Sequence, residues 1–158
     1  MNVALYARVS TEVQEARGTI GSQLEALRSR AAQDGHQVVA EFLVGDSRVS
    51  RVYYPGLPSH PDHAIAKCQM TGFGGMVCFD LDGRYERAAR LYDRLSVIKR
   101  AASLGGVESL MSMPVLTSQW GHSDEQLREA GVTKGMLRLS VGLEDPADLI
   151  ADLDHALS

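Results

Sequence analysis

His60 and His63 are three residues apart, a spacing that on a helix would place both imidazoles on one face, where they could share a metal ion. Pro58 and Pro61 stand beside them, which indicates an entry from a loop into a helix rather than a helix interior. No further cluster of cysteine or histidine supplies a third ligand. We therefore expect no metal site.

Two other segments contain residue types that are found in phosphate and cofactor sites. Phe73-Gly74-Gly75-Met76 is rich in glycine, but it precedes a predicted strand, so it offers no helix N-terminus to an anion. Lys134 follows a threonine, as a Schiff-base lysine can, but it lies in the turn before another predicted strand. We expect neither segment to bind a phosphate or a cofactor.

Arg138 belongs to the most regular alternating segment of the chain, residues 136–143. Leu137 and Leu139 fall on one side of this segment, and Arg138 and Ser140 fall on the other. The alternation predicts a strand that places an arginine on one face of a sheet. Taken alone, the pattern indicates a surface arginine on a half-exposed sheet.

The elements before residue 45 are predicted as strand, helix and strand. Alternating Val3, Leu5 and Ala7 indicate the first strand, and apolar residues at helical spacing indicate a helix from about Thr19 to Asp34. Residues 38–44 are almost continuously apolar and partly β-branched, which predicts a strand after Gly35.

The elements after residue 45 alternate between strands and helices. We expect strands at residues 49–54, 76–81 and 136–143, helices at 61–70, 85–98 and 124–130, and short extended pieces at 101–104 and 109–113. A final helix begins at Pro146 with Asp145 as its cap. The order of these elements indicates an α/β fold with a mixed β-sheet flanked by helices.

The length of 158 residues and the hydrophobic content of 44% are typical of one compact domain. The net charge of -4 argues against a free-standing DNA-binding module, because sequence-independent DNA affinity depends on an excess of Lys and Arg. Cys68 and Cys78 are interpreted as reduced core thiols. No signal pattern or membrane-length apolar run is evident, so we expect a cytoplasmic protein without membrane association.

One set of motifs lies in residues 1–44: Tyr6-Ala7-Arg8-Val9-Ser10-Thr11, Gln14, Ser22 to Leu27, and Asp34-Gly35-His36. This segment resembles the start of a serine recombinase of the resolvase and invertase type. The resemblance implies that Ser10 is a nucleophile toward DNA phosphate and that Arg8 is a phosphate clamp. Val97 stands where the family's later arginine motif has its second arginine. We therefore expect neither recombination nor a DNA partner.

A second set of motifs comprises Arg51 to Pro61, Gly74-Gly75-Met76-Val77, Ser103 to Leu110, and Leu137 to Asp145. These segments resemble the C-terminal domain of the Cys/Met-metabolism enzymes that depend on pyridoxal phosphate (PLP), such as cystathionine γ-synthase and γ-lyase. The resemblance implies that Arg138 forks onto the α-carboxylate of an amino-acid substrate. It also implies that Ser109 and Glu108 line the same pocket.

The PLP resemblance also implies what this chain lacks. The family holds its cofactor lysine, phosphate cup and aspartate on a large N-terminal domain, so we expect no cofactor in the isolated chain and PLP is implied by the family only. The expected fold is that of the small domain of fold-type-I PLP enzymes, with an N-terminal β-α-β piece. We expect the helix from about Thr19 to Asp34 to replace the family's packing helix, and residues 1–44 and 45–158 to merge into one domain.

Three functional hypotheses follow from the two resemblances. The first is a non-catalytic chimera built on the small domain of a transsulfuration enzyme. The second is a residual DNA-phosphate enzyme that uses Ser10. The third is a module that binds amino-acid carboxylates, or that completes the PLP site of another chain, through Arg138. A homo-oligomer is compatible with each hypothesis, since both families build their sites across subunits.

Overall fold

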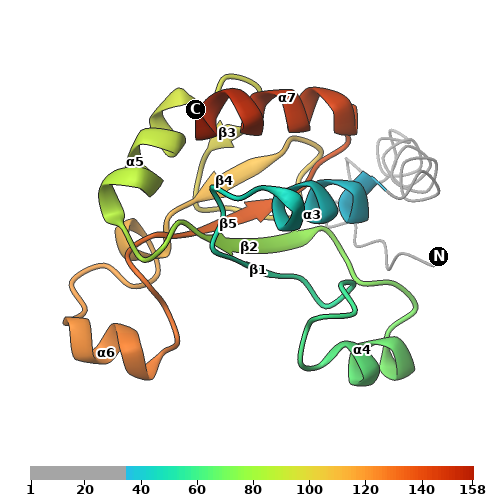
Figure 1. Ribbon diagram of the computed structural model, residues 1–158, viewed down its shortest axis with the longest axis horizontal. Coiled ribbons are helices and arrows are strands. Elements are labelled where there is room, and N and C mark those ends of the chain that lie inside the picture. The colour runs from blue at the N-terminus through green and yellow to red at the C-terminus, as the bar shows by residue number, and fades with distance from the viewer. Residues whose placement is uncertain (1–34) are drawn as a thin grey trace, which may run out of the picture.

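A five-stranded mixed sheet forms the centre of the computed structural model, which describes residues 35–158 (Figure 1). In spatial order its strands are β1 (Arg51–Tyr53), β2 (Met76–Asp80), β5 (Met136–Ser140), β4 (Leu110–Ser112) and β3 (Lys99–Arg100). The first four strands pair antiparallel, and β3 pairs parallel to β4. The predicted α/β fold with a mixed sheet flanked by helices is confirmed.

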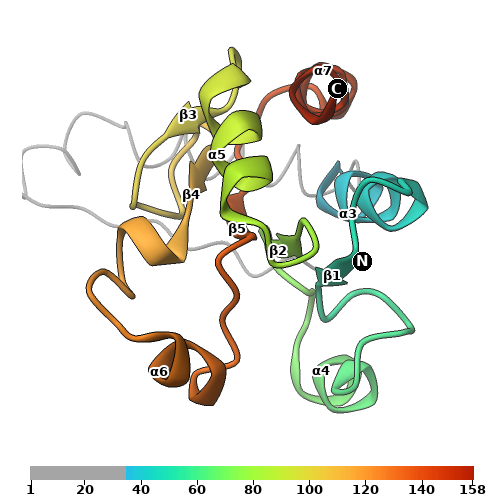
Figure 2. The same cartoon turned by 60° about the vertical axis from the view of Figure 1, so that its left-hand side comes forward.

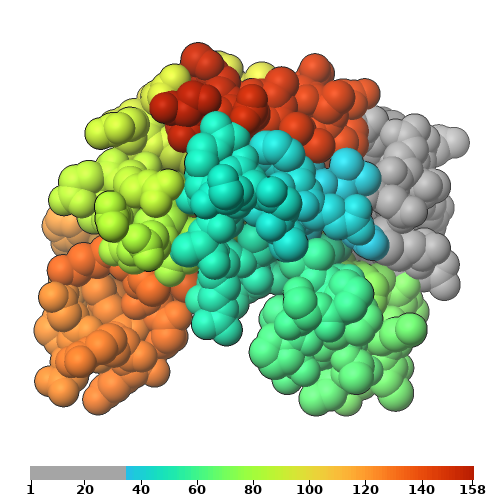
Figure 3. Space-filling view, viewed as in Figure 1, coloured from blue at the N-terminus to red at the C-terminus, as the bar shows by residue number. Residues whose placement is uncertain are grey.

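Three helices cover one face of this sheet: α3 (Gly35–Gly45), α5 (Tyr85–Arg94) and α7 (Pro146–Leu157) (Figures 1 and 2). Two short helices, α4 (His63–Gln69) and α6 (Asp124–Glu129), lie in separate lobes beyond the sheet (Figures 1 and 3). A 3-10 turn spans Pro114–Leu116. None of the described helices combines the length and the apolar character that a membrane span requires.

The hydrophobic core lies between the sheet and these three helices. Val77 and Phe79 of β2 are the cross-strand partners of Leu139 and Leu137 of β5, and all four side chains are fully buried against the helices. Burying a side chain of this size stabilises a fold by about 1.5–3 kcal/mol. The period-2 pattern of the strands therefore fixes which face of the sheet receives the helices.

The strand predicted for residues 38–44 is wrong, because these residues belong to helix α3. Val39, Ala40 and Leu43 are buried, at the spacing of one helix face, and this face packs in the same core as α7. Val38 and Val44 are 41% and 53% exposed, so the continuous apolar run does not lie in a sheet. The rest of the predicted N-terminal β-α-β piece, the strand of residues 1–10 and the helix from Thr19 to Asp34, lies outside the described residues.

Helix α5 ends at Arg94 instead of continuing to Ile98 as predicted. The carboxylate of Asp152, on α7, accepts hydrogen bonds from the backbone amides of Ser96, Val97 and Ile98 at 2.9–3.0 Å. Leu95 already has extended backbone angles, and with the three following amides bonded to Asp152 the chain leaves α5 and enters β3. A contact with a residue far along the chain therefore sets the end of this helix.

The predicted start of the final helix is confirmed. The side chain of Asp145 accepts a hydrogen bond from Ala147 N at 2.9 Å, and Pro146 occupies the first helical position. The two cysteines are free, but they differ in environment: Cys78 is half-buried on β2, whereas Cys68 is exposed on α4. The expectation that both are core thiols is therefore wrong for Cys68, since Ala66 is the buried residue of its helix.

Candidate functional site

The sheet face opposite the helices has a row of polar and reactive side chains. Tyr53, Cys78, Arg138 and Ser112 are direct cross-strand partners on β1, β2, β5 and β4. Because directly opposed residues of a sheet point to the same face, these four side chains lie side by side across it. Arg138 therefore lies on a sheet face, as predicted, between a thiol and a hydroxyl.

The guanidinium of Arg138 is held on one side by backbone carbonyls. Its Nη2 donates hydrogen bonds to the carbonyl oxygens of Ala102 at 2.7 Å and Ser103 at 3.3 Å. Its Nε is buried and has no hydrogen-bond acceptor among the described residues. An unsatisfied buried donor costs about 1–3 kcal/mol, more when it is charged, so this atom favours the approach of an anionic acceptor such as a carboxylate.

Cys78 is the thiol beside Arg138. Burial raises the pKa of Cys78, and the positive charge of Arg138 opposes this effect without cancelling it. The thiol is therefore protonated at neutral pH and is not an activated nucleophile. Its contribution to this face is an apolar contact surface next to the guanidinium.

Residues 101–109, the connection from β3 to β4, form a strap along β5 and the residues that follow it. The Oγ of Ser140 accepts a hydrogen bond from Gly105 N at 3.0 Å, and Leu143 N donates to the carbonyl of Val107 at 2.8 Å. Together with the two carbonyls that hold Arg138, these contacts fasten the strap from the middle of β5 to the residues just beyond its end. The strap therefore determines how Arg138 is presented.

Ser109 and Glu108 lie at the far end of this strap. Ser109 is fully buried, and its Oγ donates to Glu144 Oε2 at 2.7 Å while accepting from Gly142 N at 2.8 Å. Glu108 is exposed on the strap. The structure therefore brings Ser109 into a hydrogen-bond network behind the strap, with its hydroxyl already engaged, and leaves Glu108 facing solvent.

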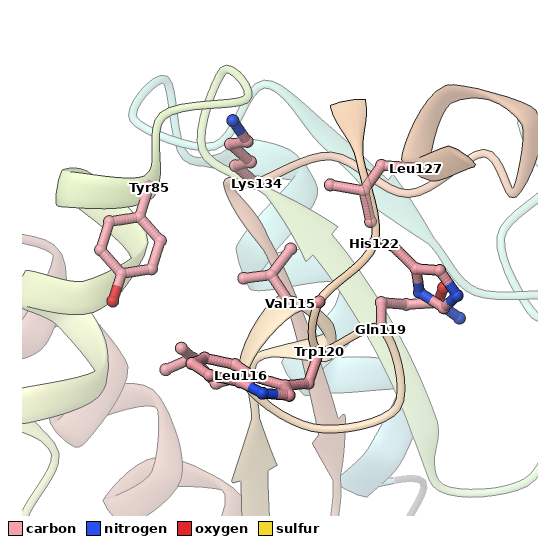
Figure 4. Close-up of a pocket in the computed structure, with 9 residues that line it drawn as sticks. Tyr85, Val115, Leu116, Gln119, Trp120, His122, Leu127 and Lys134 are labelled. Atoms are coloured by element: carbon pink, nitrogen blue, oxygen red, sulfur yellow. The ribbon is translucent and has the colours of Figure 1, made fainter. Parts of the chain in front are cut away.

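A hollow of about 270 Å³ lies between α5 and the loop that follows β4 (Figure 4). Its wall includes Tyr85, Val115, Leu116 and Trp120, and the indole of Trp120 is 73% exposed. Sequence reasoning missed this hollow, because residues 114–123 show no helical or strand periodicity. The available signal was Trp120 beside Gly121, a large aromatic side chain next to a turn glycine.

The described residues do not fit the PLP cofactor that the resemblance implies. The chain has three lysines, Lys67, Lys99 and Lys134, and all three are exposed. The Nζ of Lys134 borders the hollow, but it points away from Trp120 and Leu116 and forms an ion pair with Asp124 at 2.6 Å (Figure 4). A Schiff-base lysine needs a buried pocket that lowers the pKa of its amine, and none of these lysines has one.

The histidines considered as metal ligands have other partners. His63 Nδ1 lies 2.8 Å from the carbonyl oxygen of Pro55, and its ring stacks on Phe73. Within residues 35–158 no three His, Cys, Asp or Glu side chains are grouped as metal ligands. Arg8 and Ser10, the residues expected to act on DNA phosphate, lie outside the described part of the chain.

Comparisons with known proteins give a consistent result. The family model for Cys/Met metabolism PLP-dependent enzymes matches residues 20–158. Cystathionine beta-lyase of Lactococcus lactis subsp. cremoris (strain MG1363) is 45% identical over 138 residues, which are 87% of this chain and 36% of that protein. Cystathionine gamma-lyase of Bacillus subtilis (strain 168) is 40% identical over 139 residues, which are 88% of this chain and 35% of that protein.

Solved structures agree with these matches. The crystal structure of a cystathionine gamma-lyase from Micromonospora echinospora has a TM-score of 0.73 at 43% identity, covering 78% of this chain and 32% of that one. A putative O-acetylhomoserine (thiol)-lyase from Campylobacter jejuni has a TM-score of 0.75 at 34% identity, covering 88% of this chain and 32% of that one. The chain thus spans about a third of the length of these relatives.

Proposed function

The chain belongs to the Cys/Met metabolism PLP-dependent enzyme family, and from this premise we propose that residues 45–158 form a small domain that binds the α-carboxylate of an amino-acid substrate through Arg138. One observation carries the proposal: Arg138 lies on the face opposite the helices with a buried Nε that has no acceptor among residues 35–158. The carbonyls of Ala102 and Ser103 hold the guanidinium, and its free edge suits a carboxylate.

The chain by itself is proposed to be non-catalytic. When bound, PLP would supply the electron sink for chemistry at the amino acid, and the lysine that anchors it must come from elsewhere, because the three lysines of this chain are exposed. The role that we propose for Arg138 and the carbonyls that hold it is to bind and orient a carboxylate. On this proposal Ser109 supports the strap from behind, and Glu108 stands at its exposed side.

The chimera hypothesis is proposed in a narrower form. The family match begins at residue 20 and residues 35–45 are helical, so the similarity to the PLP family extends further toward the N-terminus than the expected boundary between residues 44 and 45. We propose that recombinase-derived sequence is confined to the residues before this match, which include Arg8 and Ser10. One merged domain is favoured by α3, since its buried face shares a core with α7 and the sheet.

A titration of the isotope-labelled full chain tests the carboxylate proposal. L-alanine is expected to shift the NMR resonance of the Arg138 Nε–H group, which is assigned by its disappearance in Arg138→Lys. L-alaninamide, which lacks the carboxylate, is the matched control ligand and is expected to leave the resonance in place. Equal shifts with both ligands, or no shift with L-alanine, would overturn the proposal.

A further inference from the structure

We infer that Glu144 is a positioning residue for Arg138 and acts on it through the strap of residues 101–109. The inference rests on the proposed role of Arg138 and extends it to a residue that does not touch the carboxylate. Four alternate positions, Arg138, Ser140, Gly142 and Glu144, each contact the strap. Because alternate residues of a strand point the same way, Arg138 and Ser140 support the strap from one face of β5, and Gly142 and Glu144 continue this support beyond the end of the strand.

The end of the strap is fixed by the carboxylate of Glu144. Oε1 accepts from the backbone amide of Ser109 at 2.6 Å, and Oε2 accepts from its Oγ at 2.7 Å. Both hydrogen bonds are to an ionised group, which makes each about twice as strong as a neutral one. Ser109 is fully buried, and its amide and hydroxyl both lose their acceptor when this carboxylate is removed.

Gly142 gives the strap direct backbone contact with the segment after β5. A Cβ at this position would lie 2.6 Å from Ser109 N and closer still to backbone atoms of Val107 and Glu108. The amide of Gly142 also donates to Ser109 Oγ at 2.8 Å. The strap therefore packs directly against the backbone at Gly142 with no space between the two segments. A displacement of Ser109 would for this reason move the rest of the strap as well.

The bend of the strap is fixed at Gly105. This residue has a φ of +73°, a conformation that glycine adopts without strain, and its amide donates to the Oγ of the buried Ser140 at 3.0 Å. The carbonyls of Ala102 and Ser103 follow on the other side of the bend and hold Nη2 of Arg138. The position of these two carbonyls thus depends on both fastenings, at Ser140 and at Glu144.

The orientation of the Arg138 side chain therefore depends on the strap as well as on β5. Its guanidinium is kept in place by carbonyls that would otherwise move with an exposed loop. Removing the Glu144 side chain leaves both carbonyls that bind Arg138 in the protein. It removes the fastening at Ser109, so the strap that contains these carbonyls can move. We therefore expect the loss of Glu144 to increase the mobility of Arg138 and to weaken carboxylate binding while the domain stays folded.

The test compares Glu144→Ala and Glu144→Gln with wild type in the full chain. Glu144→Gln keeps an acceptor for Ser109 N and can donate to Ser109 Oγ, so it should behave like wild type. In Glu144→Ala the ligand-free hydrogen exchange of the Arg138 Nε–H and of the Gly105 amide should become faster. Binding of L-alanine should weaken by about tenfold, the factor for one lost hydrogen bond of ordinary net strength. Glu129→Ala, an exposed glutamate on α6, is the matched control and should match wild type.

Two results separate this inference from the proposed function. If Glu144→Ala lowers the thermal midpoint but leaves the exchange of the Arg138 Nε–H unchanged, Glu144 has a purely structural role and the inference is overturned. If the Arg138 Nε–H of wild type does not respond to L-alanine, the proposed function fails, and the ligand-free exchange rates still decide the role of Glu144. Should Glu144→Ala not fold, Ser140→Ala removes the contact at Gly105 and should also increase the exchange of the Arg138 Nε–H.

Discussion

The carboxylate of Asp152 accepts hydrogen bonds from both the backbone amide and the hydroxyl of Ser96, fifty-six residues earlier in the chain. Both of these hydrogen bonds are to Oδ1 of Asp152, and Oδ2 accepts from the amides of Val97 and Ile98. A single side chain of α7 therefore holds the segment that links α5 to β3. This segment contributes Ile98, a buried residue of the core.

Asp152→Asn is expected to reduce the free energy of unfolding by about 2–3 kcal/mol, because a hydrogen bond to an ionised acceptor contributes about 1.5–3 kcal/mol and an amide cannot accept at both positions. Urea denaturation measures the change. Asp148→Asn, an exposed aspartate in the first turn of the same helix, is the matched control and should cost about 1 kcal/mol or less. An equal effect of the two substitutions would contradict this role of Asp152.

The stability supplied by Asp152 should disappear in acid. Burial by itself would raise the pKa of Asp152, but the hydrogen bonds from Ile98, Ser96 and Val97 outweigh burial and hold the pKa below its usual value. The contribution is complete above the unfolded-state pKa of about 3.9 and is lost as the pH falls through the lower folded-state value. The difference in unfolding free energy between wild type and Asp152→Asn should therefore shrink between about pH 5 and pH 2. A difference that stays constant over this range would count against the assignment.

Gly142→Ala should disturb the strap that covers β5. The added methyl group would lie 2.6 Å from Ser109 N, and its neighbours are backbone atoms that cannot rotate away. We expect a loss of about 1–3 kcal/mol in unfolding free energy, the usual range for overpacking. Gly45→Ala is the matched control, since a Cβ at Gly45 meets no atom within 4 Å, and thermal unfolding of the two variants gives the comparison.

Reduction with borohydride after incubation with PLP should label no single lysine of the isolated chain stoichiometrically. The reason is that Lys67, Lys99 and Lys134 are all exposed and lack a pocket for the cofactor. Mass spectrometry of the digested protein measures the labelling. One-to-one labelling at Lys134 that is lost in Lys134→Arg would show that the chain holds PLP by itself.

Incubation with supercoiled DNA that contains recombination sites should give no covalent adduct. Ser10 would be the nucleophile by resemblance, but one clamp arginine, Arg8, cannot stabilise the charge of the transition state alone, since loss of one such donor costs on the order of a hundredfold in rate. Denaturing gel electrophoresis detects the adduct. A band that forms with wild type and disappears in Ser10→Ala would restore the recombinase hypothesis.

The parts of the fold that local chemistry determines were predictable from the sequence. The Asp145-Pro146 start of α7 follows from the requirements of a helix N-terminus, and the alternation of β5 follows from the pleat. The apolar run of residues 38–44 predicts a strand and not the observed helix, because a continuous apolar run has no period that would mark one helix face. Packing against α7 decides that Val39 and Leu43 are buried while Val38 and Val44 are not, and this contact is not visible in a local window.

The candidate site was predictable in type but not in arrangement. The alternating pattern placed Arg138 and Ser140 on one face, and the structure has them on one face. The pattern did not show that Ser109 faces Glu144, because that contact joins residues thirty-five positions apart. Nor did it show that the backbone of Ala102 and Ser103 holds the guanidinium, since carbonyl groups have no sequence signature.

The strand β3 ends one side of the described sheet with two residues, Lys99 and Arg100, whose side chains are exposed. A short edge with two positive charges is a poor template for the strand of another molecule, because a second copy would bring the same charges against it. Arg100 is further engaged with Asp93 of α5 at 3.0 Å. This edge of the described sheet therefore disfavours the addition of a strand from a neighbouring copy.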